Sequence, residues 1–165
     1  MRGILEAYDD TERRVFVVDS FKGLPPPTPE LYPADTNDQL YTMTQLAISR
    51  QQVEDNFRRY GLLDERVVFL EGWFKDTLPT APTDRIAVLR LDGDMYESTI
   101  QIYENCYHKV SRGGVVIVDD YGAIPGAKQA TLDFRARHGI TSPILPIDST
   151  GVWWIADHPP VPAPR

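Results

Sequence analysis

Uninterrupted apolar runs, rather than alternating ones, mark the candidate strands of this chain. Four such runs end at an acidic residue and span positions 15–19, 67–71, 86–92 and 115–119. A continuous apolar strand is typical of a parallel sheet that helices cover on both faces. Two later runs, at positions 144–148 and 152–156, predict a further pair of strands.

Residues with helical spacing lie between these runs. Ser49 and Gln52 have the spacing of a capping box at the start of a helix, and Gly61 follows that helix as a stop signal. Asp94 and Glu97 have the same spacing, so we expect Asp94 to cap the next helix. Strands that alternate with helices predict the α/β class with right-handed crossovers.

Residues 24–48 interrupt this alternation with a long stretch that contains five prolines. Loops of this length in a compact domain are usually lids or disordered segments. Because this one leaves the carboxyl end of the first strand, we predict a lid. We expect residues 1–156 to form one domain and residues 157–165, which are rich in proline, to form a disordered tail.

Composition limits the classes of function. The chain has 165 residues, a net charge of −7 and no basic run, which argues against binding to nucleic acid. The lone Cys106 excludes an internal disulfide and a cysteine-based zinc site. No apolar stretch approaches ~18 residues, so we expect no membrane segment and a cytoplasmic location.

Three aspartates follow two of the apolar runs: Asp92 ends one, and Asp119 and Asp120 end the other. The carboxyl ends of parallel strands meet at one edge of a sheet, where ligands bind. Three carboxylates at that edge form an all-oxygen cluster suited to Mg²⁺ or Mn²⁺. In the alternative interpretation, Asp119 and Asp120 only make hydrogen bonds in the turn before Gly122. Asp94 is left out of the cluster because capping explains it.

Two further strand ends carry candidate ligand-binding residues. Asp19, followed by Ser20, is placed to accept ribose hydroxyls, or else to cap the turn that follows. Gly72 permits a close backbone approach, and the indole of Trp73 beside it has the shape to lie against an adenine ring. In the alternative interpretation, Trp73 and its neighbour Phe74 belong to the core.

Six blocks, taken in order, resemble the macrocin O-methyltransferase family. They are VDSFKGLP, GLLDERVVFLEGWFKDTLP, LRLDGDMYEST, GGVVIVDDYG, GAKQATLDFRARHGI and GVWWI. Members of this family are class I enzymes that depend on S-adenosylmethionine and methylate sugar hydroxyls in antibiotic biosynthesis. The resemblance covers nearly the whole chain and is weakest in residues 24–48 and in the tail.

The resemblance implies a Rossmann-like class I methyltransferase sheet, mostly parallel with a final antiparallel strand pair. It implies that Asp92, Asp119 and Asp120 bind a divalent metal, Mg²⁺ or Mn²⁺, and that Asp92 also acts as the catalytic base. It further implies that Asp19, Ser20, Gly72 and Trp73 bind S-adenosylmethionine. The expected acceptor is a small molecule, a glycosylated natural product whose sugar hydroxyl is methylated.

The chain departs from the family at its start. Family members carry a first strand and a glycine-containing turn upstream of residues that match Met1. We therefore expect an N-terminally truncated sheet, with unpaired edges on the strands that end at Asp19 and Asp92. Such edges would favour self-association into a homo-oligomer.

Two alternatives stay open at this point. The first is a non-catalytic or inactive, truncated methyltransferase-like subunit. The second is a phosphatase of the haloacid-dehalogenase type. The segment LRLDGDMYEST superficially resembles the DxDx(T/V) motif of that class. In that class the motif normally opens the domain, and its two acidic blocks lie further apart than they do here.

Overall fold

The strands β1 (Val15–Asp19) and β2 (Val67–Glu71) form a parallel pair in continuous register. The computed structural model describes residues 1–157, so the predicted tail lies, apart from Asp157, outside the described residues. The chain divides into two compact units. The first consists of residues 1–25 and 40–77, and the second of residues 26–39 and the chain from residue 78 onward.

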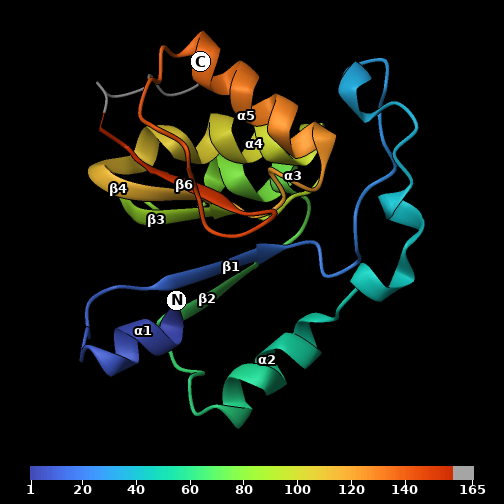
Figure 1. Cartoon of the computed structure of the whole chain (residues 1–165). Helices are drawn as coiled ribbons and strands as arrows, with labels where there is room; N and C mark the ends of the chain where they lie inside the picture. Colours follow the sequence, from blue (N-terminus) through green and yellow to red (C-terminus); the bar gives the residue numbers. More distant parts are fainter. Residues whose placement is uncertain (158–165) are drawn as a thin grey trace. The chain divides into compact units, whose positions relative to one another are not determined.

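The first unit also contains the helices α1 (Arg2–Ala7) and α2 (Arg50–Arg59) (Figure 1). The short helix α3 (Phe74–Thr77) follows β2 in the chain. The side chain of Ser49 accepts a hydrogen bond from the amide of Gln52 at 3.2 Å and so caps α2. The helix ends at Arg59, and Gly61 takes a positive φ of 66° just beyond it. The predicted start and stop of this helix are confirmed.

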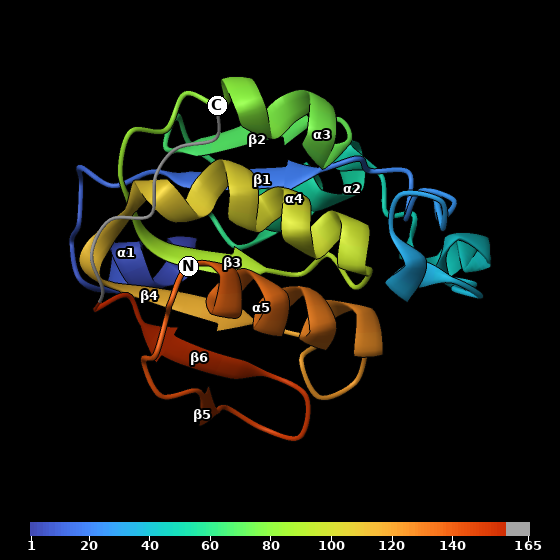
Figure 2. The ribbon, with the colours of Figure 1, turned by 90° about the horizontal axis from the view of Figure 1, so that it is seen from above.

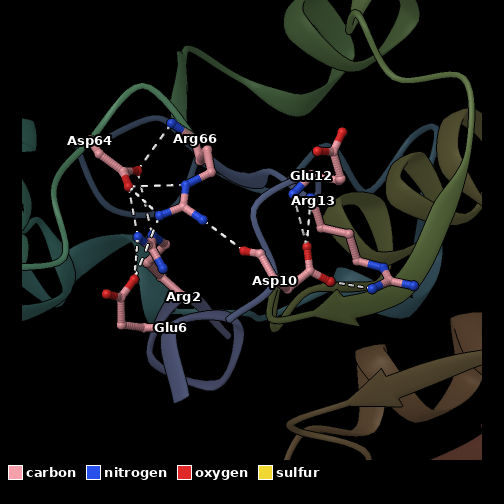
Figure 3. A network of polar contacts seen from close by, with 7 residues as sticks. All are labelled: Arg2, Glu6, Asp10, Glu12, Arg13, Asp64 and Arg66. Carbon is pink, nitrogen blue, oxygen red and sulfur yellow. Dashed lines mark hydrogen bonds and ion pairs between the residues drawn. The ribbon is translucent and has the colours of Figure 1, made fainter. Parts of the chain in front are cut away.

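A polar network joins α1 to the chain segments that lead into β1 and β2 (Figure 3). The carboxylate of Asp64 accepts hydrogen bonds from Nη2 of Arg2 at 2.6 Å and from Nη2 of Arg66 at 2.7 Å. Arg2 also pairs with Glu6 one turn along α1, at 2.8 Å. Arg66 donates to the backbone oxygen of Asp10 at 2.7 Å. The network therefore fixes the amino ends of both strands.

In the second unit, four strands lie in the order β3-β4-β6-β5 (Figure 2). Their bounds are β3 (Ile86–Leu91), β4 (Val110–Val118), β5 (Leu145–Pro146) and β6 (Val152–Ile155). β3 and β4 are parallel, whereas β6 pairs antiparallel with both β4 and β5. The predicted final antiparallel pair is confirmed, although β5 is only two residues long.

The helices α4 (Tyr96–Cys106) and α5 (Pro125–Arg137) pack against each other and lie over one face of this sheet (Figure 1). The core between them is aromatic. The ring of Tyr103 stacks on Phe134 with centroids 4.6 Å apart, and Trp154 of β6 lies 6.4 Å from the same tyrosine. All three side chains are at most 1% exposed. Burial of such large side chains removes much apolar surface from water and so stabilises the unit.

Burial on both faces was predicted for the strands, and for β3 this prediction is wrong. Leu89 and Leu91 are buried, whereas Val88 is 39% exposed and Arg90 is also exposed. The burial along β3 therefore alternates, as it does in a strand with one covered face. An apolar residue such as Val88 on the open face gave the run its continuous appearance.

Capping of α4 by Asp94 is also wrong. Helix α4 begins at Tyr96, and its first amides donate to the carboxylate of Asp35, at 2.7 Å from Tyr96 and 2.9 Å from Glu97. Asp94 instead adopts a positive φ of 56° in the turn before the helix. The cap comes from the proline-rich loop, where Asp35 ends a short 3₁₀ turn, η1 (Pro33–Asp35).

Among the described strands, β1 and β3 share no ladder hydrogen bonds and belong to separate sheets. This agrees with the unpaired edges expected for the strands that end at Asp19 and Asp92. Residues 24–48 are not uniformly irregular, because they contain η1 and the 3₁₀ turns η2 (Leu40–Thr42) and η3 (Thr44–Leu46). None of the helices in the described part of the chain combines the length and the apolarity that a membrane crossing requires.

Candidate metal and cofactor sites

The three aspartates at the carboxyl ends of β3 and β4 come together in the structure. Leu91 pairs with Val118 in the parallel register, and the amide of Asp119 donates to the oxygen of Leu91 at 3.0 Å. The residues that follow, Asp92 and Asp119, therefore leave neighbouring strands side by side. One carboxylate oxygen from each of Asp92, Asp119 and Asp120 lies within 4.8 Å of the other two.

Asp120 contributes an oxygen that suits a ligand role. Its Oδ2 atom is buried and accepts no hydrogen bond from the described residues. The turn that follows is closed by the main-chain oxygen of Asp120, which accepts from the amides of Ala123 and Ile124 at 3.1 Å and 2.8 Å. The side chain is therefore not needed for the turn, and a buried acceptor without a donor costs free energy unless a cation or water meets it.

The electrostatics of the cluster favour a positive partner. Burial is the main cause that raises the pKa of Asp120 to about 7, and the charge of the neighbouring Asp94 adds to it. Burial also raises the pKa of Asp94, while a side-chain hydrogen bond with Asp120 opposes that change. Asp94 thus adjoins the cluster from which the capping argument had excluded it.

Arg90 is a member of this site that the sequence reasoning missed. Its Nη1 atom lies 2.6 Å from Oδ2 of Asp92, and its Nη2 atom lies 2.9 Å from Oδ1 of Asp119. One guanidinium therefore bridges two of the three carboxylates. A signal was available, because residues i and i+2 of a strand face the same side and the sequence places Arg90 two positions before Asp92.

The donor set fits a hard divalent cation. All three side chains offer oxygen, one of these oxygens is buried without a donor, and the carboxylates are within the range that a single ion can bridge. Arg90 partly neutralises the cluster but reaches only two of its members. Asp92, Asp119 and Asp120 are the residues that would hold the ion.

A pocket lies in the first unit, at the carboxyl ends of β1 and β2. Its volume of about 350 Å³ is at the small end of the range for ligand sites. Three of the four residues expected to bind the cofactor, Ser20, Gly72 and Trp73, line this pocket. Three others were not foreseen: Lys22, Glu71 and Asp76. Glu71 is the last residue of β2, and Lys22 and Asp76 come shortly after β1 and β2, so the position of each strand end was the available signal.

Asp19 does not line the pocket but is hydrogen-bonded to Gly72, which does. Its main-chain oxygen accepts from the amide of Gly72 at 2.9 Å, which extends the β1–β2 ladder by one bond. Its Oδ1 atom accepts from the amide of Phe21 at 2.6 Å. Turn capping, the structural alternative for this residue, is therefore present in the structure. It does not exclude a ribose contact, because a carboxylate oxygen can accept more than one hydrogen bond.

Gly72 and Trp73 are placed as a close-approach turn would require. Gly72 has a φ of 146°, and a Cβ atom at this position would lie 2.8 Å from Cγ2 of Thr77. The neighbouring Trp73 is partly exposed and lines the pocket. A side chain at position 72 would crowd the turn that presents the indole.

Comparisons with known proteins agree with this architecture. Residues 1–156 match the protein family described as Macrocin-O-methyltransferase (TylF). The chain is 52% identical over 155 residues to 8-demethyl-8-(2,3-dimethoxy-alpha-L-rhamnosyl)-tetracenomycin-C 4'-O-methyltransferase of Streptomyces olivaceus, covering 93% of this chain and 59% of that protein. It is also 52% identical, with the same coverage, to demethyldecarbamoylnovobiocin O-methyltransferase of Streptomyces niveus.

Among solved structures, the O-methyltransferase NovP superposes with a TM-score of 0.92 at 50% identity, covering 96% of this chain and 66% of that one. A calicheamicin methyltransferase superposes with a TM-score of 0.70 at 20% identity, covering 93% and 65%, and shows the fold alone. The chain spans about three fifths of the length of the two Streptomyces relatives. The α/β methyltransferase fold is thus shared with solved enzymes, and the chain belongs to the macrocin-O-methyltransferase family.

Proposed function

We propose that this chain carries the metal-binding and part of the cofactor-binding machinery of an S-adenosylmethionine-dependent O-methyltransferase. The proposed acceptor is a hydroxyl, on a sugar of a natural product. The observation that carries the proposal is the meeting of Asp92, Asp119 and Asp120 at the carboxyl ends of β3 and β4, in a chain of this family. The relatives support the acceptor class, because the substrate of the first one is named as a rhamnosyl compound.

The acceptor hydroxyl is a weak nucleophile because little of it is ionised near neutral pH. When bound, a divalent cation would supply Lewis acidity that favours the alkoxide form. Asp92 is the exposed member of the carboxylate cluster, so it is accessible to an incoming hydroxyl. Its carboxylate would accept the hydroxyl proton. Asp119 and Asp120 are half-buried and would complete the set of ligands for the ion.

The pocket of the first unit is the proposed site for the nucleoside of S-adenosylmethionine. When bound, that cofactor would supply an electrophilic methyl group. Ser20, which lines the pocket, and Asp19 next to it in the chain would hold the ribose. The backbone at Gly72 and the indole of Trp73 would lie against the adenine. The partly exposed indole and the crowding that a Cβ would cause at Gly72 support this assignment.

The proposal is tested by two titrations on the wild type and Asp119→Asn. We expect Mn²⁺ to bind the wild type and to bind the variant at least tenfold more weakly, because one of three charged ligands is lost. Binding of S-adenosylmethionine, followed by calorimetry, should be equal in both proteins. Asp84→Asn, at an exposed position in the loop before β3, provides a matched control.

Mn²⁺ affinity unchanged by Asp119→Asn would refute the metal role. Methyl transfer to a glycosylated acceptor in the presence of a chelator would do the same. A chain that binds neither Mn²⁺ nor S-adenosylmethionine would support the non-catalytic alternative. Hydrolysis of an aryl phosphate would support the phosphatase alternative, which the family match disfavours.

A further inference from the structure

The helix that follows the carboxylate cluster has no capping side chain of its own. Its N-cap residue is Met95, which is fully buried and offers no acceptor to the first amides of α4. The four first amides of a helix need partners from outside it. Asp35, 61 residues earlier in the chain, supplies two acceptors: Oδ1 accepts from Tyr96 and Oδ2 from Glu97.

Asp35 is held firmly in this place. It is only 2% exposed, and burial of an acidic side chain requires compensating hydrogen bonds. The 3₁₀ turn η1 that carries it contacts both α4 and α5. A Cβ atom on Gly126, at the start of α5, would lie 3.0 Å from Oδ1 of Asp35 and 2.8 Å from the amide nitrogen of Tyr96. Only glycine therefore leaves room for this approach.

Two more contacts seat the same segment. Oγ1 of Thr28 donates to Oε2 of Glu97 at 2.7 Å, and the ring of Tyr32 lies 6.1 Å from that of Tyr96. Gln101 donates to the other oxygen of Glu97 at 3.0 Å. Residues 28–35 therefore contact the first turn of α4 at three separate points, and we name them the clasp segment.

The first turn of α4 is joined to the cluster by a short and tightly packed turn. Only three residues separate Asp92 from Tyr96. The amide of Met95 donates to the oxygen of Gly93 at 2.6 Å, and a Cβ on Gly93 would lie 3.0 Å from Cβ of Ser98. A connection this short and closely packed has little slack, so a shift in the first turn of α4 would move Asp92.

We propose that Asp35 is a positioning residue, which seats the clasp segment on α4 and thereby holds Asp92 in place for the carboxylate cluster. In this proposal, residues 28–35 of the proline-rich loop are fixed on the first turn of α4. The expected effect on metal affinity rests on the proposed function. The contact of the clasp segment with α4 is independent of the proposed function.

The test compares Asp35→Asn and Thr28→Val with the matched control Glu30→Gln. Asparagine keeps the shape of aspartate but presents one acceptor and one donor, so one of the two helix amides loses its partner. Thr28→Val removes the hydrogen bond to Glu97 and keeps the branched shape. Glu30 is exposed in the same segment, and its substitution makes the same change of charge as Asp35→Asn.

Two measurements are made on the 165-residue chain after its thermal unfolding has been checked. The first is the Mn²⁺ dissociation constant, from the electron paramagnetic resonance signal of the free ion. The second is the rate of chymotryptic cleavage after Leu31, followed by mass spectrometry. We expect Asp35→Asn to weaken Mn²⁺ binding and to speed cleavage, each about fivefold, the factor that corresponds to a lost helix cap. Thr28→Val should act in the same direction by about twofold, and Glu30→Gln should match the wild type.

A folded Asp35→Asn variant with wild-type Mn²⁺ affinity would overturn the positioning role, even if cleavage is faster. If Asp35→Asn does not fold, wild-type behaviour of Thr28→Val in both measurements would overturn it. A wild type that binds no Mn²⁺ would contradict the proposed function, and faster cleavage of Asp35→Asn would then still support the seating of the clasp segment.

Discussion

The guanidinium of Arg90 lies 2.6 Å from the carboxylate of Asp92, two positions further along the chain. A second nitrogen of the same guanidinium lies 2.9 Å from Asp119. The cluster proposed to bind a metal ion is thus partly neutralised by a cation that belongs to the protein. Arg90 and a divalent ion would compete for the same two carboxylates.

Replacing Arg90 by methionine should therefore tighten Mn²⁺ binding, by roughly two- to fivefold. This modest factor reflects the partial exposure of the pair, because solvent screens exposed ion pairs. The same variant should unfold at a lower temperature than the wild type in the presence of a chelator, since three carboxylates then lie close together without a counter-ion. Fluorimetric melting curves with EDTA and with Mn²⁺ measure both effects.

Arg112→Met is the control for this substitution. Arg112 lies on β4, is highly exposed and pairs only loosely with Asp157, at 3.5 Å. It should leave the Mn²⁺-induced shift in melting temperature unchanged. Equal shifts in Arg90→Met and the wild type would show that the guanidinium does not compete with the ion.

The network around Asp64 predicts a pH dependence of stability. Hydrogen bonds from Arg2 and then Arg66 hold the pKa of Asp64 well below its usual value. A carboxylate with a lowered folded-state pKa stabilises the folded chain above its unfolded pKa, about 4, and loses this contribution as the pH falls below that value. Asp64→Asn should therefore lower the melting temperature at pH 7, and the difference from the wild type should shrink as the pH drops below about 4.

Asp9→Asn provides a comparison at an exposed aspartate of the same unit. Its positive φ of 52° suits asparagine as well as aspartate, so the melting temperature at pH 7 should barely change. A melting-temperature difference between Asp64→Asn and the wild type that is the same at pH 3 and pH 7 would contradict the assignment.

Gly126 predicts a steric effect. Alanine is normally the better helix residue, yet its Cβ here would lie 2.8 Å from the amide nitrogen of Tyr96. We expect Gly126→Ala to lower the free energy of unfolding by ~1–3 kcal/mol, as overpacking typically does. Chemical denaturation measures this. Gly3→Ala in α1 is the control, because its Cβ would meet only Leu62, at an ordinary 3.7 Å, and it should be neutral or stabilising.

The aromatic core distinguishes two tyrosine hydroxyls. The hydroxyl of Tyr107 accepts a hydrogen bond from Nε1 of the fully buried Trp154 at 3.2 Å. Tyr107→Phe leaves that donor without this acceptor and should cost ~1–3 kcal/mol. Tyr103→Phe should cost less, about 1 kcal/mol, since Thr131 keeps its bond to the oxygen of Ala127 at 2.8 Å. Equal costs, measured by urea unfolding, would contradict this ranking.

Parts of this molecule that depend on local order were predicted from sequence. The strands β1 and β2 coincide with their apolar runs, and the cap of α2 by Ser49 involves residues three apart. The meeting of Asp92 with Asp119 followed from one topological rule, that neighbouring parallel strands end at the same edge. The roles of these aspartates in binding a metal stay predictions.

The wrong predictions have a common physical cause: each depends on which distant part of the chain packs against the residue. The cap of α4 comes from Asp35, and a capping-box pattern at Asp94 and Glu97 gives no information about a partner 61 residues away. Likewise, an apolar side chain on an open face, such as Val88, does not differ in sequence from one on a covered face. The N-cap residue itself, Met95, makes no side-chain hydrogen bond to the helix, since methionine is not a capping residue.

The position of Asp35 at the first turn of α4 also affects the order in which the chain folds during synthesis. The amides that receive this carboxylate belong to residues 96 and 97, so the clasp segment leaves the ribosome long before its docking surface exists. Until α4 and α5 have been translated, residues 28–35 have no complete surface to pack against. The second unit therefore cannot fold in strict order from its amino end. The clasp segment is synthesised first within this unit but is among the last parts to reach its folded position.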